Sequence, residues 1–352
     1  MRLFHCDHCG ALISFTAHEC PNCGVPLGYV CKDRSVRSLA TTPDPAVFEV
    51  ETEPGGARLW RCLNAAWGCN WMLPAAGADV WCRSCRLTRG RPDESDPAAV
   101  EAWITAEAVK RRLVHQLDEL ALRIDIRSTA TPDGLAFDLV YLPGTGGITG
   151  HTEGVVTLDL CEADDVRREE LRRRLGEPFR TVIGHLRHEI GHHFWKRLVA
   201  QTDAIDTFRQ LFGDDRADYA AAISGYYAHG PGVWDPSRHV TAYAAAHPLE
   251  DWAETFAHYL HILDATDTAA AHHLVPVEHA ADVVGDRVVT VDFGTILDAW
   301  RPVNAAVNAV AETLGAPIVY PYEPAGIVID KLAFVHRQVA AHTERDRFYG
   351  LV

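Results

Sequence analysis

Two histidines and a glutamate lie close together near the middle of the 352-residue chain. His188 and His192 are four residues apart, so on a helix of 3.6 residues per turn their side chains project from one face. Two neutral imidazoles in this arrangement can bind one Zn²⁺, and Glu189 between them can accept a proton from a water on the metal. The spacing predicts a hydrolytic metal site. A buried helix with hydrogen-bonded core histidines is the alternative, because so short a pattern also arises by chance.

The residues around this motif have the pattern of a helix. Apolar side chains recur at helical spacing from Phe179 to Leu198. Pro178 suits the first turn of such a helix, where its missing N–H is not needed. We therefore expect an apolar stripe that faces a core, with His188 and His192 along its edge.

A second segment, residues 247–261, also has ionisable residues at helical spacing. Pro248 marks the first turn of the predicted helix. A face of this kind is either solvated or one wall of a metal site, and the motif upstream favours the metal site. Four ionisable residues share the face: Glu250, Glu254, His258 and His261.

Eight of the ten cysteines fall into two groups of four. Paired C-x-x-C units place sulfurs around one metal within tight turns, so each group predicts a structural Cys₄ zinc site. In the second group, the six-residue gap between Cys62 and Cys69 is longer than that of a standard knuckle. Disulfides are the alternative, which the absence of an apolar signal segment at the start disfavours. The first group is Cys6, Cys9, Cys20 and Cys23, and the second is Cys62, Cys69, Cys82 and Cys85; Cys31 and Cys161 are left over and are expected to be buried or inert.

The net charge of −15 is unevenly distributed. Residues 1–92 contain 10 Lys/Arg and 8 Asp/Glu, whereas the remainder contains 23 and 40. An acidic body disfavours binding to nucleic acid or to an anionic membrane. No apolar run reaches the length of a membrane span, so we expect a cytoplasmic protein without a membrane partner.

Four tryptophans and several arginines lie around the second cysteine group. Together they could form a basic, aromatic surface for nucleic acid. The alternative, which we favour, is that the tryptophans pack the small ribbon and the arginines are solvated. The tryptophans are Trp60, Trp67, Trp71 and Trp81.

These patterns predict an α+β protein that is mainly helical with a small sheet. Residues 1–92 form the zinc-ribbon region, with modules at 1–28 and 58–92 and a polar connection at 29–57, and residues 93–352 form the second domain. In the second domain we expect helices at 97–120, 164–176, 293–315 and 325–341, strands at 134–142 and 154–160 joined by a loop at 143–150, and a site-lining loop at 225–246.

Several runs of the sequence match a known family. The chain resembles a bacterial family of zinc-binding metallopeptidases with an N-terminal zinc ribbon, over nearly all of its length. The resemblance implies a zincin-like metallopeptidase domain after the two ribbons. The matching runs are Cys62–Trp71, Thr149–His151, Glu162–Asp165, Phe179–Trp195, His247–His261 and Lys331–His336.

The pair of helices more remotely resembles the gluzincins, including thermolysin-like and lethal-factor-type peptidases. This resemblance implies that Glu250 is the third zinc ligand and that Glu254 orients His188. It also implies that Tyr243, seven residues before Glu250, stabilises the transition state; His239 or His247 would be the alternative. Leu198 occupies the position of the third metzincin histidine, which excludes the metzincin pattern.

We therefore predict a zinc-dependent peptidase that holds one catalytic and two structural Zn²⁺ ions. Glu189 would be the general base, and the substrate would be a peptide or protein that extends along the edge of the strand at 155–160. We do not expect nucleic acid as a partner. The alternatives are a ribbon protein that binds protein or nucleic acid on an inactive zincin scaffold, and a zinc amidase for a small molecule.

Overall fold

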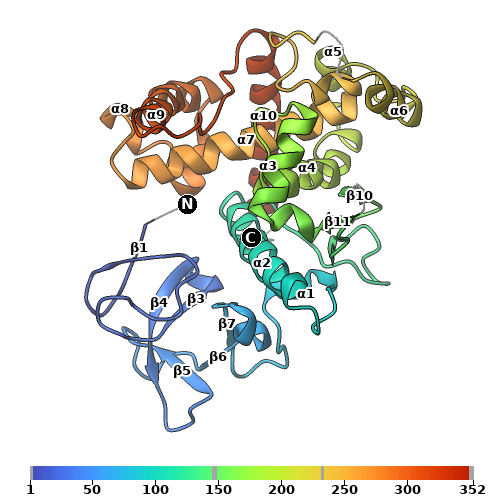
Figure 1. Cartoon of the computed structure of the whole chain (residues 1–352). Helices are drawn as coiled ribbons and strands as arrows, with labels where there is room; N and C mark the ends of the chain where they lie inside the picture. The colour runs from blue at the N-terminus through green and yellow to red at the C-terminus, as the bar shows by residue number, and fades with distance from the viewer. Residues whose placement is uncertain (1–2, 145–148, 231–233, 349–352) are drawn as a thin grey trace.

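The computed structural model describes residues 3–144, 149–230 and 234–348 (Figure 1). Short strands form the N-terminal part, and long helices form most of the rest, which confirms the predicted α+β class. The strands are β1 (Phe4–His5), β2 (Leu12–Ile13), β3 (Leu27–Val30), β4 (Ser35–Thr41), β5 (Val47–Val50), β6 (Leu59–Arg61), β7 (Met72–Pro74), β8 (Thr88–Gly90), β9 (Ala136–Val140), β10 (Gly150–Thr152) and β11 (Val155–Asp159). The helices are α1 (Arg83–Arg86), α2 (Pro97–Glu119), α3 (Asp165–Leu175), α4 (Val182–Trp195), α5 (Ile205–Phe212), α6 (Tyr219–His229), α7 (Pro248–Ala271), α8 (Val277–Ala280), α9 (Phe293–Thr313) and α10 (Ile327–Phe348).

The N-terminal strands form a larger sheet than the sequence predicted. β3 to β7 make a five-stranded antiparallel sheet, so residues 29–57 are part of a sheet and the prediction of a simple connection was wrong. The Pro and Gly residues of this segment lie in turns, while apolar side chains between them, such as Val36, Leu39 and Val50, are buried. Because these strands are short and are separated by turns with Pro or Gly, they lack the long alternating hydrophobic pattern by which a strand is predicted.

A second sheet has the strand order β10-β11-β9-β8. β9 and β11 confirm the two predicted strands, and they pair in parallel. The predicted loop at 143–150 lies partly outside the described residues, and the strand β10 that begins at its end was not predicted. Because β10 covers β11 on one side and β9 covers it on the other, the prediction that 155–160 presents a free edge was wrong. On this side of the sheet, the edge strand is β10.

Helix α2 joins the strands to the helical part (Figure 1). Asp96 caps it by accepting hydrogen bonds from the first-turn N–H groups. On the strand side, the Trp103 ring packs against Trp67 with centroids 5.9 Å apart. On the other side, Gln116 Nε2 donates to the Leu260 carbonyl of α7 at 2.7 Å. One continuous core therefore extends from the strands to the helices.

Helices α4 and α7 pack closely enough to bring their side chains to one site. A Cβ on Gly191 would lie 3.0 Å from the Cα of Ala253, so glycine permits this approach. Trp252 Nε1 donates to the Gly191 carbonyl at 2.8 Å and fixes the relative position of the helices. Helix α4 begins at Val182, because Thr181 Oγ1 caps the N–H of Gly184; the prediction that Pro178 opens it was wrong.

The remaining predicted helices are confirmed as α3, α9 and α10, and α7 begins at Pro248 as expected. The predicted loop at 225–246 contains the end of α6 and a 3₁₀ turn at Tyr243–Ala246, and 231–233 lie outside the described residues. Among the helices that the structure describes, none combines the length and apolar character needed to cross a membrane.

Candidate metal centres

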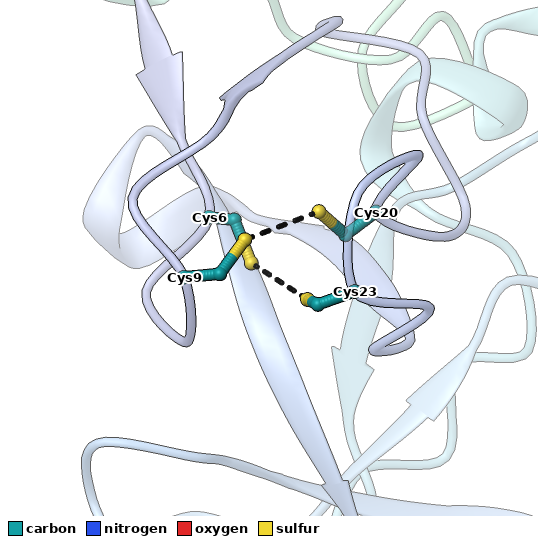
Figure 2. Close-up of side chains that lie close together, drawn as sticks. All are labelled: Cys6, Cys9, Cys20 and Cys23. Atoms are coloured by element: carbon teal, nitrogen blue, oxygen red, sulfur yellow. Dashed lines mark hydrogen bonds between the residues drawn. The ribbon is translucent and has the colours of Figure 1, made fainter.

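The first cysteine group converges on one point (Figure 2). The Sγ atoms of Cys6 and Cys23 are 3.7 Å apart, and those of Cys9 and Cys20 are also 3.7 Å apart. Four thiolates at about 2.3 Å from a tetrahedral zinc lie about 3.8 Å from each other. A disulfide requires about 2.05 Å, so this group has the dimensions of a zinc site and not of a disulfide.

The turns that carry these cysteines have the backbone of a zinc knuckle. Gly10 and Gly24 each follow the second cysteine of a pair, with φ values of +72° and +73° that only glycine adopts readily. Their N–H groups donate to the carbonyls of Cys6 and Cys20 at 2.8 and 3.0 Å. The sequence Cys-x-x-Cys-Gly therefore determines the turn locally.

The second group is more enclosed. Cys69 Sγ lies 3.7 Å from Cys82 Sγ and 3.8 Å from Cys85 Sγ. The Cys82 N–H donates to Cys62 Sγ at 3.2 Å, as expected of a thiolate ligand. A 3₁₀ turn at Leu63–Trp67 fills the longer gap in this group. All four of these cysteines are buried, whereas Cys9 and Cys23 of the first group are exposed.

The tryptophans near this group pack the protein. Trp71 is fully buried, Trp67 contacts Trp103, and Trp60 packs against the core. Trp81 is exposed. This arrangement matches the packing alternative for the tryptophans.

All ten cysteines are free thiols, so the disulfide alternative was wrong; of the two outside the groups, Cys31 is exposed and Cys161 is buried.

A third centre lies between α4 and α7. His188 Nε2 and His192 Nε2 are 3.2 Å apart. Glu250 Oε2, from the first turn of α7, lies 3.0 Å from the first of these nitrogens and 3.5 Å from the second. Ligands at about 2.0–2.1 Å from a tetrahedral zinc are about 3.3–3.4 Å apart, so the three atoms have the spacing of three zinc ligands.

The chemistry of this centre also fits a cation. Glu250 is 1% exposed, and its Oε2 has no hydrogen-bond partner among the described residues. A buried carboxylate oxygen without a partner is costly, and a metal ion would satisfy it. His188, Glu189 and His192 each place a possible ligand atom within 4.8 Å of one another.

Glu254 fixes the orientation of His188. Its Oε1 lies 2.6 Å from His188 Nδ1, so the imidazole proton sits on Nδ1 and the lone pair of Nε2 faces the centre. Thr241 Oγ1 donates to the other oxygen of Glu254 at 2.7 Å. Burial alone would raise the pKa of Glu254, but the hydrogen bond from His188 lowers this pKa to about 2.

Glu189 and Tyr243 line a cleft of about 460 Å³ beside this centre. Burial raises the pKa of the Glu189 carboxyl above its usual range, which makes it a stronger proton acceptor. Burial also raises the pKa of Tyr243, so its hydroxyl keeps its proton and can donate. The Tyr243 ring lies 5.9 Å from that of His188.

Three further residues at the centre were not singled out in the sequence. His151 lies on the edge strand β10 and lines the cleft; burial lowers its pKa to about 3, so its ring is neutral. Tyr219 also lines the cleft and donates its hydroxyl to Glu250 Oε1 at 2.5 Å. Thr241 is the third. Of these, His151 alone had a signal, because it lies in a run that matches the family.

Four histidines that were considered for the site take other positions. His258 bonds to the hydroxyl of Tyr320, and His261 Nδ1 lies 2.6 Å from Arg187 Nη1, so only the two glutamates of the α7 face reach the centre. His247 caps α7, and His239 faces Asp251 at 3.8 Å. Neither His239 nor His247 is among the residues that line the cleft.

Comparison with known proteins agrees with this geometry. The family described as "Putative zinc-binding metallo-peptidase" matches residues 99–338, which include α4 and α7. The chain belongs to this family. A zinc-ribbon domain matches residues 3–96, which include both cysteine groups.

The relatives found share almost the whole chain. An uncharacterized protein of Mycobacterium tuberculosis and one of Mycobacterium bovis are each 40% identical over 342 residues, which cover 96% of this chain and 95% of theirs. No solved structure matches the chain. The family relationship thus covers both the ribbon region and the helical part.

Proposed function

We propose that the chain is a gluzincin-like, zinc-dependent peptidase in which His188, His192 and Glu250 hold the catalytic metal. The observation that carries this proposal is the convergence of two imidazole nitrogens and one partnerless carboxylate oxygen beside an open cleft. Three protein ligands and a free fourth position are the arrangement of catalytic zinc sites. The two cysteine groups offer four ligands each and would be structural.

Zinc at this centre would supply a water of lowered pKa and would polarise the carbonyl of the scissile bond. Glu189 would accept a proton from the attacking water, for which its raised pKa suits it, and would pass that proton to the leaving amine. Tyr243 donates its hydroxyl to the oxyanion that develops on the substrate. Glu254 and Thr241 keep His188 in one tautomer throughout.

The edge of β10 favours a peptide over a small amide as substrate. This strand lines the cleft, and among the described residues it pairs on one side, with β11. An extended peptide can add to such an edge through main-chain hydrogen bonds. Cysteines that bind zinc and form no disulfides suit a reducing compartment, and we therefore place the protein in the cytoplasm.

The decisive experiment compares Glu189→Gln with the native protein on a peptide library. We expect the variant to keep its zinc and to lose hydrolysis by about 10²–10⁴-fold or more, because only the proton acceptor is removed. Glu170→Gln, at an exposed position of α3, is the matched control and should keep native activity. Full activity in Glu189→Gln would refute the assigned base. If native protein holds no third zinc, the peptidase proposal fails.

A further inference from the structure

A tyrosine from a separate helix reaches the proposed zinc ligand. We propose that Tyr219 is a positioning residue for the metal, which commits Glu250 to binding through one oxygen and connects helix α6 to the centre. This inference rests on the proposed function, because it requires a metal on Glu250. It concerns a residue that takes no part in the mechanism above.

The two oxygens of Glu250 have different surroundings. Oε1 accepts the hydroxyl proton of Tyr219 at 2.5 Å, and Oε2 faces the two histidines without a hydrogen-bond partner among the described residues. A carboxylate without such a donor can rotate and bind a metal through both oxygens. The hydroxyl of Tyr219 removes that freedom, so a fourth position stays open for water.

His247 positions Tyr219. The N–H of Leu249 donates to His247 Nδ1 at 3.1 Å, so the ring proton lies on Nε2. Nε2 then donates to the carbonyl of Ala217 at 3.1 Å, two residues before the tyrosine. The edge of one ring also meets the face of the other, with centroids of His247 and Tyr219 5.1 Å apart. The start of α7 therefore fixes both Glu250 and the segment that carries its hydrogen-bond donor.

Helix α6 has little else to hold it near the centre. None of its residues is buried, and Tyr219 itself is 43% exposed. The other ring contacts of the helix with the cleft are those of Tyr226 and Tyr227 with Tyr243, with centroids 5.1 and 6.5 Å apart. A helix with few buried contacts opens at low cost in free energy. Because Tyr219 bonds to a metal ligand, we expect metal binding to stabilise α6 beside the cleft.

The test measures metal binding and does not need a substrate. Tyr219→Phe removes the hydroxyl that bonds to Glu250 and keeps the ring. Tyr226→Phe is the matched control: it removes a hydroxyl from the same helix, but that hydroxyl does not contact Glu250. Zinc affinity of the third centre is measured by chelator competition, with the cysteine groups kept loaded. We expect a 10–100-fold loss of affinity for Tyr219→Phe and native affinity for Tyr226→Phe.

Two further measurements separate positioning from general structure. Co²⁺ in the third centre of Tyr219→Phe should show the weaker d–d bands of higher coordination, because Glu250 is then free to bind through both oxygens. Amide exchange of α6 should slow on metal binding in the native protein, and less so in Tyr219→Phe.

The outcomes are distinct. Equal zinc affinity and equal Co²⁺ spectra in the two variants would overturn the inference and leave the peptidase proposal intact. A native protein that binds zinc only at its cysteine groups would overturn both.

Discussion

The cysteine groups and the histidine–glutamate centre arrange their candidate metal ligands in opposite ways. Each cysteine group collects four identical soft ligands from a short stretch of chain, as Cys6 to Cys23 illustrates. The other centre takes its ligands from two helices, and Glu250 follows His188 by 62 positions. The first arrangement would enclose a metal and hold small strands together, whereas the second would leave a position open to a cleft of about 460 Å³.

The difference shows what each site requires of the fold. A Cys₄ site can form wherever two knuckles meet, so zinc binding there contributes directly to folding. The histidine–glutamate centre instead depends on a finished core, because Gly191 must pack against Ala253 before Glu250 reaches the histidines. We therefore expect metal loss to unfold the first kind of site and to leave the second kind folded.

The largest predicted effect tests this contrast directly. Cys69 contacts two other sulfurs of a fully buried group, so Cys69→Ser should release one zinc and unfold the surrounding strands, with a loss of the order of 10–16 kcal/mol of apparent binding free energy. His192→Ala should also release one zinc but keep the unfolding transition of the ribbon region. Zinc content and tryptophan fluorescence during urea unfolding measure both. Equal losses of unfolding free energy in Cys69→Ser and His192→Ala would show that the two kinds of site do not differ in this way.

The next effect separates a ligand from the residue that orients it. Glu250→Ala should empty the third centre, because one of three ligands is lost. Glu254→Ala should weaken zinc binding by about 10–100-fold, since His188 loses the acceptor that fixes its tautomer. Isothermal titration with zinc distinguishes the two. If Glu254→Ala empties the site and Glu250→Ala does not, the two assignments must be exchanged.

The smallest predicted effect is a pH dependence of the helical part. Burial lowers the pKa of His193 to about 4, against about 6.5 in an unfolded chain. The unfolded state therefore binds more protons between these values, so stability is complete above about pH 6.5 and falls as the pH drops toward 4. His193→Gln should reduce the slope of unfolding free energy against pH by up to about 1.4 kcal/mol per pH unit.

Urea unfolding at a series of pH values, with zinc in excess, measures this slope. His272→Gln, at an exposed position at the end of α7, is the control and should keep the native slope. If His193→Gln keeps the native slope of unfolding free energy against pH, His193 is not the group that makes the helical part lose stability at low pH.

Much of the metal chemistry could be predicted because its determinants are local. Cys6-x-x-Cys9 and its partner knuckle specify their turns within a few residues, and Gly10 supplies the backbone conformation that the turn needs. His188 and His192 share a helical face by spacing alone. Glu250 and Glu254 were assigned through resemblance to gluzincins, and the structure places both beside His188.

Other features depended on contacts that the local sequence does not encode. β10 is a three-residue strand, and residues 29–57 form short strands without a long hydrophobic pattern, so neither gives a clear periodic signal. Pro178 has the properties of a helix start, yet Thr181 provides the cap. Local preference at a helix end is weak, and a capping hydrogen bond decides between nearby positions.

The sequence alone determined which residues can bind metal and on which helices they lie, because ligand type and spacing are properties of neighbouring residues. Only the tertiary structure decided which other side chains surround the candidate metal centre. Tyr219 and Thr241 reach the site from segments outside both metal-binding helices, and His151 does so from an edge strand. Their roles arise from the packing of α4 against α7 and from the position of β10, which are long-range contacts that no local pattern records.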